Sequence, residues 1–217
     1  MQIYCEICKN KNFVKILNKN KTKIYTNRED NKKDNKKLKC ILYQCKNCNF
    51  VFQKITKKLK DSLSKIYKSE FAQLSQPLGQ GNWGKKRFLA LKGKLDRINR
   101  YKHGSILEIG CGNGYVLKYL KKLGFKDLTG VDPSLNKTCK EKKIDLLNKF
   151  VTKKLNLKKK FDFIFSIGFY EHVFNLNEIT SFSLKHLNDD GEIFLVIPNF
   201  FSSLTNGNPD LFAHEHI

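Results

Sequence analysis

Glycines and acidic residues between positions 105 and 133 have the spacing of a nucleoside-binding unit. A short apolar run with β-branched residues at 106–109 predicts a buried strand, and apolar residues at helical spacing over 115–123 predict a helix. Three glycines alternate with other residues in the turn between them. Glycine lets the backbone approach a ligand closely and adopt φ > 0, and the helix start offers free N–H groups and a positive dipole end.

The stretch after this helix supplies the second half of the unit. A strand is predicted at 128–131 and ends at Asp132, because Pro133 cannot continue it. An acid at the tip of the second strand, about 20 residues after the glycines, can accept hydrogen bonds from both hydroxyls of a ribose. The chain therefore contains a nucleoside-binding strand–helix–strand unit. The turn reads G-x-G-x-G, with Tyr115 where a dinucleotide-binding fold would have its last glycine.

Four cysteines near the N-terminus form two C-x-x-C pairs. Two such pairs of thiolates suit a tetrahedral zinc ion, and the predicted ligands are Cys5, Cys8, Cys45 and Cys48. The gap between the pairs is longer than in most zinc ribbons, so the very polar stretch 18–39 is expected to form a mobile excursion. Cys40 has no C-x-x-C partner and is expected not to bind metal. The alternatives are free core cysteines or a redox dithiol.

Hydrophobic patterns predict the remaining elements. A glycine-rich loop at 76–84 holds the only tryptophan, Trp83, and is either a lid over the ligand or an anchored linker. The other expected elements are a strand at 49–53, helical stretches at 54–71, 85–101, 134–147 and 176–187, strands at 150–151, 161–166 and 192–197, and a turn at 188–191.

This series of elements resembles the class I S-adenosylmethionine-dependent methyltransferases, which have an α/β, Rossmann-like sheet. The resemblance implies that S-adenosylmethionine is the cofactor, with Glu108 at its methionine end, the glycine turn beneath it and Asp132 on its ribose. The residues that it assigns to the cofactor are Glu108, Gly110, Cys111, Gly112, Gly114, Asp132 and Ser166. Many relatives have an acid or amide for adenine where this chain has Thr152 and Lys153, so that ligand is not assigned.

A four-cysteine lobe before such a core is similar to the C-methyltransferases that act on nucleotide-linked keto-sugars. That resemblance implies a bound zinc ion and a nucleotide-sugar substrate. It also implies that His216 is the base that removes the proton next to the keto group, that Glu215 orients it, and that Tyr67 reaches the substrate. Without the resemblance, residues 214–217 would be a polar tail.

Glu171 and His172 match another pattern of these methyltransferases, at the start of a helix beside the cofactor. His172 is either a hydrogen-bonding residue at that helix start or an acid/base that faces the substrate.

The expected domains are a zinc-binding lobe at 1–56, a helical linker with the glycine–tryptophan lid at 57–101, and a methyltransferase domain at 102–217. The class I fold has seven strands, and the patterns predict five. We therefore expect the methyltransferase domain to be truncated after its fifth strand, which leaves that strand as an exposed edge.

The composition leaves two other functions open. The formal net charge is +22, but only four of the 42 basic residues are arginine, and arginine is the better residue for phosphate and base recognition. Much of the charge therefore reflects lysine on solvated faces. An RNA methyltransferase is one alternative, although the loop 166–170 has no proline such as base N-methyltransferases carry. The other is a non-catalytic remnant that binds zinc and cofactor.

The sequence also predicts a location. No apolar run reaches the roughly 18 residues of a membrane span, and the N-terminus lacks the apolar core of a signal peptide. Seven cysteines, an odd number, favour a reducing compartment. We expect a cytoplasmic protein, and the sequence does not predict its oligomeric state.

Overall fold

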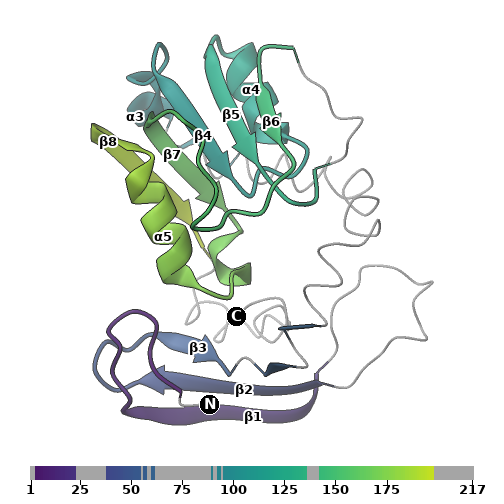
Figure 1. The fold of residues 1–217 in the computed structure, drawn as a ribbon, viewed down its shortest axis with the longest axis vertical. Helices are drawn as coiled ribbons and strands as arrows, with labels where there is room; N and C mark the ends of the chain where they lie inside the picture. The colour runs from purple at the N-terminus through teal and green to yellow at the C-terminus, as the bar shows by residue number, and fades with distance from the viewer. Residues whose placement is uncertain are drawn as a thin grey trace, which may run out of the picture. The chain divides into compact units, whose positions relative to one another are not determined.

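We analysed the protein in a computed structural model. It describes residues 3–22, 38–54, 56–57, 60–61, 89, 92–93, 95–135 and 142–197. The chain divides into two compact units. One contains a three-stranded antiparallel sheet and the other a five-stranded parallel sheet (Figure 1).

The first unit is built on strands β1 (Phe13–Thr22), β2 (Leu38–Cys45) and β3 (Val51–Gln53), which lie in the order β1-β2-β3. The prediction of a loop over 18–39 is wrong at both ends, because Asn18 pairs with Ile41 and Thr22 pairs with Leu38. Antiparallel pairing satisfies backbone groups whatever the polarity of the side chains. The polar composition of this stretch therefore did not prevent strand formation.

The second unit contains the parallel sheet and its helices. Its elements, in chain order, are α3 (Leu95–Asn99), β4 (Ser105–Ile109), α4 (Tyr115–Lys122), β5 (Asp127–Val131), β6 (Asp145–Leu147), β7 (Phe161–Ile167), η2 (Tyr170–His172), α5 (Leu176–Lys185) and β8 (Leu187–Val196). The strand order is β6-β5-β4-β7-β8, with every pair parallel. The α/β, Rossmann-like sheet of five parallel strands predicted from the sequence is thereby confirmed.

The order of the strands reverses between β4 and β7. From β4 the chain steps outward to β5 and β6, and it then crosses to β7 and β8 on the other side of β4 (Figure 1). In open parallel sheets, ligands bind at the carboxyl ends of the strands on either side of such a switch point. The glycine turn follows β4 directly, so the topology places it at this position.

Two predicted elements are wrong in position. The third strand is β6, Asp145–Leu147, which pairs with Thr129–Val131, whereas Phe150 and Val151 are not in a strand. The end of the predicted helix 134–147 is therefore strand. The predicted turn at 188–191 lies inside β8, where the register steps from Leu187 opposite Phe161 to Glu192 opposite Phe163. The sheet absorbs the extra residues as an irregularity in its edge strand.

Both faces of the sheet are covered, which explains why its central strands are almost continuously apolar. On one face, Phe163 and Phe165 of β7 pack in a cluster that includes Val116, Leu117 and Leu120 of α4. On the other face, Ile164 packs in a cluster with Phe182 of α5. Adjacent residues of one strand thus contact opposite layers of helices.

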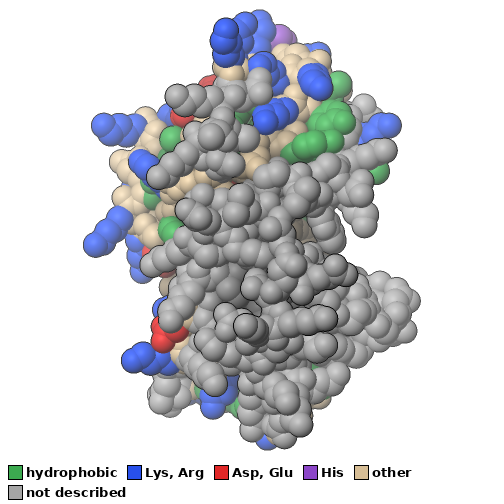
Figure 2. Space-filling view, turned by 90° about the vertical axis from the view of Figure 1, so that its right-hand side faces the viewer, with side chains coloured by type: hydrophobic (Ala, Val, Ile, Leu, Met, Phe, Trp, Pro, Cys, Tyr) green, Lys and Arg blue, Asp and Glu red, His purple; other side chains and the backbone are tan. Residues whose placement is uncertain are grey.

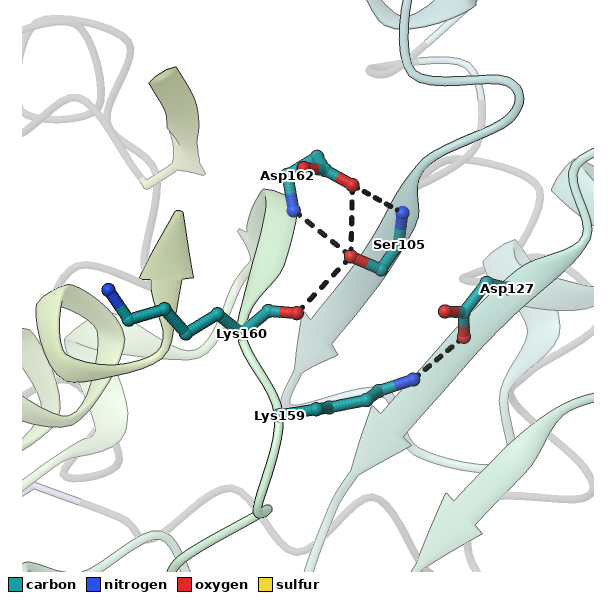
Figure 3. Close-up of polar contacts among 5 residues, drawn as sticks. All are labelled: Ser105, Asp127, Lys159, Lys160 and Asp162. Atoms are coloured by element: carbon teal, nitrogen blue, oxygen red, sulfur yellow. Dashed lines mark hydrogen bonds and ion pairs between the residues drawn. The ribbon is translucent and has the colours of Figure 1, made fainter. Parts of the chain in front are cut away.

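A polar network joins the starts of β4 and β7. The Asp162 carboxylate accepts hydrogen bonds from the backbone N–H of Ser105 at 2.7 Å and from its hydroxyl at 3.0 Å (Figure 3). It also accepts a hydrogen bond from the Asn188 side chain at 2.6 Å. The Ser105 backbone N–H is the largest cause that holds the pKa of Asp162 below its ordinary value of 3.8. Lys159 and Asp127, also drawn in Figure 3, form an ion pair at 2.7 Å on the surface.

The first prediction concerns this network. Asp162→Asn should lower the free energy of unfolding by about 1–3 kcal/mol at pH 7, because the partly buried backbone N–H of Ser105 loses its charged acceptor. Since the folded pKa lies below the unfolded one, the contribution is complete above the unfolded pKa and is lost as the pH falls through the folded pKa. Urea unfolding at pH 7 and at pH 3 should therefore show the difference from wild type shrinking in acid.

Asp127→Asn is the matched control. Its carboxylate is half exposed in the ion pair with Lys159, and exposed ion pairs contribute between about 0 and 1 kcal/mol. Equal losses in the two variants, or a loss in Asp162→Asn that does not change with pH, would contradict the role given to the network.

Candidate cofactor and metal sites

The glycine turn adopts a conformation that its glycines make accessible. Gly110, Gly112 and Gly114 have φ angles of 76°, 55° and 70°, in the left-handed region that L side chains rarely adopt. A β-carbon on Gly114 would also lie 2.9 Å from Leu146 of β6. Gly114 is the N-cap of α4 and makes no side-chain hydrogen bond there, so α4 begins without a capping side chain next to the turn.

Asp132 ties the end of β5 to the turn. Its Oδ2 accepts the backbone N–H of Gly112 at 2.8 Å, and its Oδ1 accepts the backbone N–H of Ser134 at 2.7 Å and the Ser134 hydroxyl at 2.5 Å. The residue is 9% exposed. The sequence assigned Asp132 and the glycine turn to the same cofactor, and in the structure the two are in direct contact. Ser134 was not predicted, although a serine two residues after an aspartate is a common turn signal.

Two further predicted cofactor residues are buried polar groups near this edge of the sheet. Glu108 is 1% exposed and lies in β4, two residues before the turn. Ser166 is 2% exposed and lies near the end of β7, and its hydroxyl has no hydrogen-bond partner among the described residues. A buried hydroxyl without a protein partner commonly binds water or a ligand.

Cys111 contributes to the turn in a different way. Its side chain is 3% exposed, and a β-carbon on Gly130 would lie 2.7 Å from its sulfur. The thiol therefore packs against β5, and any contact with a cofactor falls to the main chain of this residue.

Phe169 is a residue near the turn that the sequence reasoning missed. A β-carbon on Gly110 would lie 2.7 Å from the Cβ, Cγ and Cδ2 atoms of Phe169. Phe169 follows β7, and β4 and β7 run parallel with Glu108 opposite Phe165. The two strands therefore end at the same edge. The one local signal was Gly168, which has a φ angle of 64° and redirects the chain after β7.

The four predicted metal ligands lie together in the first unit. The sulfur atoms of Cys5, Cys8, Cys45 and Cys48 all lie within 4.8 Å of one another. The sulfur of Cys5 is 3.5 Å from that of Cys48, and the sulfur of Cys8 is 3.5 Å from that of Cys45. A zinc ion with Zn–S distances of about 2.3 Å holds its sulfurs about 3.8 Å apart. The cluster therefore fits a tetrahedral metal ion.

The two C-x-x-C pairs have the same backbone conformation. The N–H of Lys9 donates to the carbonyl of Cys5, and the N–H of Asn49 donates to the carbonyl of Cys45, both at 2.9 Å. Lys9 and Asn49 have φ angles of 60° and 59°. Each pair is thus a closed turn whose fifth residue is left-handed. The backbone holds both halves of the thiol cluster in place.

Cys8 and Cys48 differ in pKa in the absence of a metal ion. A hydrogen bond from the Asn47 side chain is the largest cause that lowers the pKa of Cys8 to about 6. The backbone N–H of Phe50 lowers the pKa of Cys48, but burial and the neighbouring thiols outweigh it and raise that pKa to about 12. Four sulfurs this close cannot all ionise without a cation to compensate their charge.

The predicted residues Tyr67, Glu215 and His216 lie outside the described residues, and so does the glycine–tryptophan loop. His172 is in the 3-10 helix η2 rather than at the start of an α-helix, and its Nε2 is 4.0 Å from Oε1 of Glu171. The acid/base role of these residues stays a prediction.

The sequence matches the family described as a methyltransferase domain over residues 83–217, more than half of the chain. The chain belongs to the methyltransferase domain family. The prediction that it is a methyltransferase is therefore confirmed at the level of the family, and the matched region includes the glycine turn, Asp132 and all five parallel strands. A search of curated proteins found no significant match.

Solved structures support the fold of this methyltransferase. The plantazolicin methyltransferase BpumL in complex with SAH has a TM-score of 0.55 and 21% identity, over 73% of this chain and 70% of that one. BpumL in complex with a monoazolic desmethylPZN analog and SAH has a TM-score of 0.52 and 24% identity, over 73% and 70% of the two chains. At this identity the likeness indicates a shared fold.

The distribution of basic side chains on the surface indicates which kinds of partner the methyltransferase could bind. On the face shown in Figure 2, Lys and Arg side chains of the described residues are spread among other residue types rather than gathered in one patch. A basic stripe or patch is the usual footprint of a nucleic-acid site. None of the helices in the described ranges has the length and apolar character of a membrane span.

Proposed function

We propose that this methyltransferase uses S-adenosylmethionine and binds it across the carboxyl ends of β5, β4 and β7. The observation that carries the proposal is the contact between Asp132 and the glycine turn. An ionised carboxylate has about four lone-pair sites. Among the described residues, Gly112 and Ser134 donate to three of those on Asp132. The fourth site, on Oδ2, suits a ribose hydroxyl. The Ser134 hydroxyl can rotate to admit a second one.

The fit of the cofactor's other end rests on Ser166 and the glycines. In a ligand whose ribose lies at the end of β5, the amino-acid part crosses the turn after β4 and reaches β7. Ser166 offers a buried hydroxyl there, with no hydrogen-bond partner among the residues that the structure describes. The bound cofactor would supply the activated methyl group, and the chain's residues bind and orient it.

Ser166→Ala provides a test with effects of opposite sign. Removing a buried hydroxyl that has no hydrogen-bond partner in the described part of the chain should leave the ligand-free protein as stable as wild type or slightly more stable. Loss of a hydrogen bond to the cofactor should weaken binding of S-adenosylhomocysteine by about 5- to 30-fold. Thermal unfolding and calorimetric titration measure the two effects. Ser183→Ala is the control, because that hydroxyl bonds to Tyr170 and to the carbonyl of Ile179, and its loss should lower stability instead.

We further propose that the substrate is a nucleotide-linked keto-sugar and that the methyl group goes to the carbon next to the keto group. This proposal rests on the resemblance given by the four-cysteine lobe. His216 would remove the proton from that carbon, with Glu215 orienting its ring, and the carbanion would take the methyl group as the sulfur–methyl bond breaks. A histidine near neutral pH is a suitable base for such a carbon acid.

Methyl transfer to a panel of nucleotide-linked keto-sugars and to RNA, followed with labelled donor, tests the substrate. Incorporation into a sugar that is lost in His216→Gln would support the proposal, and proton exchange at the sugar carbon should be lost with it. Incorporation into RNA alone would favour the RNA methyltransferase. Cofactor binding without turnover on either panel would favour the non-catalytic remnant.

We propose zinc as the metal of the first unit. Four thiolates in two C-x-x-C pairs are the ligand set that zinc prefers for a structural site. The two matching backbone turns support this proposal, because they hold the sulfurs within 4.8 Å of one another. Such a site stabilises the fold and takes no part in the methyl transfer.

A further inference from the structure

The ring of Phe169 fills the space beside the first glycine of the turn. Three of its atoms lie where they would be 2.7 Å from a β-carbon on Gly110. Gly110 directly follows β4 and has a φ angle of 76°, and Phe169 comes two residues after the end of β7. An aromatic side chain therefore lies against the glycine turn on the side where β7 ends, and it is only partly buried there.

Neighbouring residues hold this ring in place. The N–H of Gly168 donates to the carbonyl of Val196 at 2.9 Å, which ties the start of the loop to β8. Tyr170 meets the ring edge to face, with centroids 6.0 Å apart and planes at 83°. The Tyr170 hydroxyl is in turn 3.1 Å from the Ser183 hydroxyl of α5. Tyr170 and α5 thus hold the ring of Phe169 in position.

The reacting sulfur of the cofactor would lie near this ring, a placement that rests on the proposed function. Asp132 at the end of β5 takes the ribose, and the sulfur is bonded to the ribose through one carbon. Neighbouring strands are about 4.8 Å apart, and β4 lies between β5 and β7. A cofactor that runs from β5 across β4 therefore brings its sulfur over the carboxyl end of β4, beside the Phe169 ring that packs against Gly110.

That sulfur changes charge in the reaction. In the donor it is a sulfonium cation. When its bond to the methyl group breaks, the electron pair stays on sulfur and leaves a neutral thioether. The face of an aromatic ring attracts a cation within about 6 Å, more strongly where water is excluded. A neutral thioether lacks this attraction to the ring.

We propose that Phe169 is a specificity-determining residue that recognises the sulfonium charge, so that the site prefers S-adenosylmethionine to its product S-adenosylhomocysteine. The consequence is easier exchange of spent product for fresh donor. None of the residues that the sequence assigned to the cofactor was given this role.

The test compares three ligands by calorimetric titration of the full chain. S-adenosylmethionine and sinefungin carry a positive charge at this position, as a sulfonium and an ammonium, whereas S-adenosylhomocysteine is neutral. Phe169→Leu should weaken the binding of S-adenosylmethionine and sinefungin by about 5- to 30-fold. It should change the affinity for S-adenosylhomocysteine by less than about twofold. Phe194→Leu is the control, because that ring stacks on Phe163 within the sheet core and its loss should affect the three ligands equally.

A second measurement avoids any dependence on the folding of Phe169→Leu. Replacing Phe169 by phenylalanines with one, two and three ring fluorines keeps its shape and progressively weakens the attraction of its face for cations. Affinity for S-adenosylmethionine and sinefungin should fall stepwise along this series, while that for S-adenosylhomocysteine stays constant.

The outcomes separate this inference from the function on which it rests. Equal weakening of all three ligands in Phe169→Leu, or a flat response to fluorination, would show that the ring only packs against Gly110 and would overturn the inference. Failure of the wild-type chain to bind S-adenosylhomocysteine at all would instead overturn the proposed cofactor site.

Discussion

Cys45→Ser should release zinc and unfold the first unit while the five-stranded sheet stays folded. Cys45 is fully buried, and its neighbours in the lobe core are Cys5 and Phe52. The three-stranded sheet is small, so its described core holds few apolar side chains, and a core of this size rarely supports a fold alone. Structural zinc sites contribute roughly 10–16 kcal/mol of apparent binding free energy at pH 7, and the loss of one thiolate would remove a large part of that.

Two measurements check this result. Elemental analysis of the purified protein should give one zinc per wild-type chain and much less than one for Cys45→Ser. Limited proteolysis should then cut the variant within residues 1–64 at low protease concentration and leave the second unit intact. Addition of a strong chelator to the wild-type chain should reproduce the same cleavage pattern, because metal binding and folding of such a lobe are coupled.

Cys40→Ser is the matched control. Cys40 belongs to β2, five residues before Cys45, and has no C-x-x-C partner. The Cys40→Ser chain should keep one bound zinc ion and should resist protease as well as wild type does. A Cys45→Ser chain that retains a full equivalent of zinc would contradict the proposed ligand set, and zinc loss from Cys40→Ser would mean that the fifth thiol takes part.

Zinc binding should also depend on pH in a definite direction. The ligands are thiolates, and the pKa of Cys48 is raised to about 12 without a metal ion, so zinc must displace protons that the cluster holds at pH 7. Binding at neutral pH should therefore release protons and weaken as the pH falls. Titrations in buffers of different ionisation enthalpy count the protons released.

The parts of the fold that the sequence predicted are those specified by local patterns. Strand β4, the turn after it and α4 were predicted to within about one residue, because glycines with positive φ and a helical repeat of apolar residues are properties of neighbouring positions. The two C-x-x-C pairs are local in the same sense. A further local signal went unused: both pairs are followed by a left-handed residue, and Asn49 is of a type that adopts this conformation readily.

What the sequence could not predict depends on contacts between distant residues. The position of β6 is fixed by its pairing with β5, and its three residues carry no pattern of their own. Phe169 is 59 positions from Gly110 and reaches it only because β4 and β7 are adjacent in the sheet. The same holds for the extra residues 188–191, which resemble a turn in sequence but form an irregularity inside the edge strand β8.

Asp132→Asn should weaken binding of S-adenosylhomocysteine by about 100- to 1,000-fold. The carboxylate would lose its charge-assisted hydrogen bonds to the ribose, and each such bond contributes about 1.5–3 kcal/mol. The substitution should also lower the stability of the ligand-free protein by about 1–3 kcal/mol, because the Gly112 N–H now donates to Oδ2 at 2.8 Å. Asparagine is preferable to alanine here because it keeps the volume of a side chain that is 9% exposed.

The two effects need to be separated, since a distorted turn would also weaken binding. Ser134→Ala removes one hydrogen bond to Oδ1 and keeps the charge, so it should reduce stability while weakening binding by less than about tenfold. Analogues of S-adenosylhomocysteine that lack the 2′ or 3′ hydroxyl complete a double-mutant cycle with Asp132→Asn. If the carboxylate contacts the ribose, the wild-type chain loses affinity for the deoxy analogues and the variant loses little more. If wild type and variant lose equal affinity on removal of either hydroxyl, Asp132 serves only to hold the glycine turn, and the ribose must bind elsewhere.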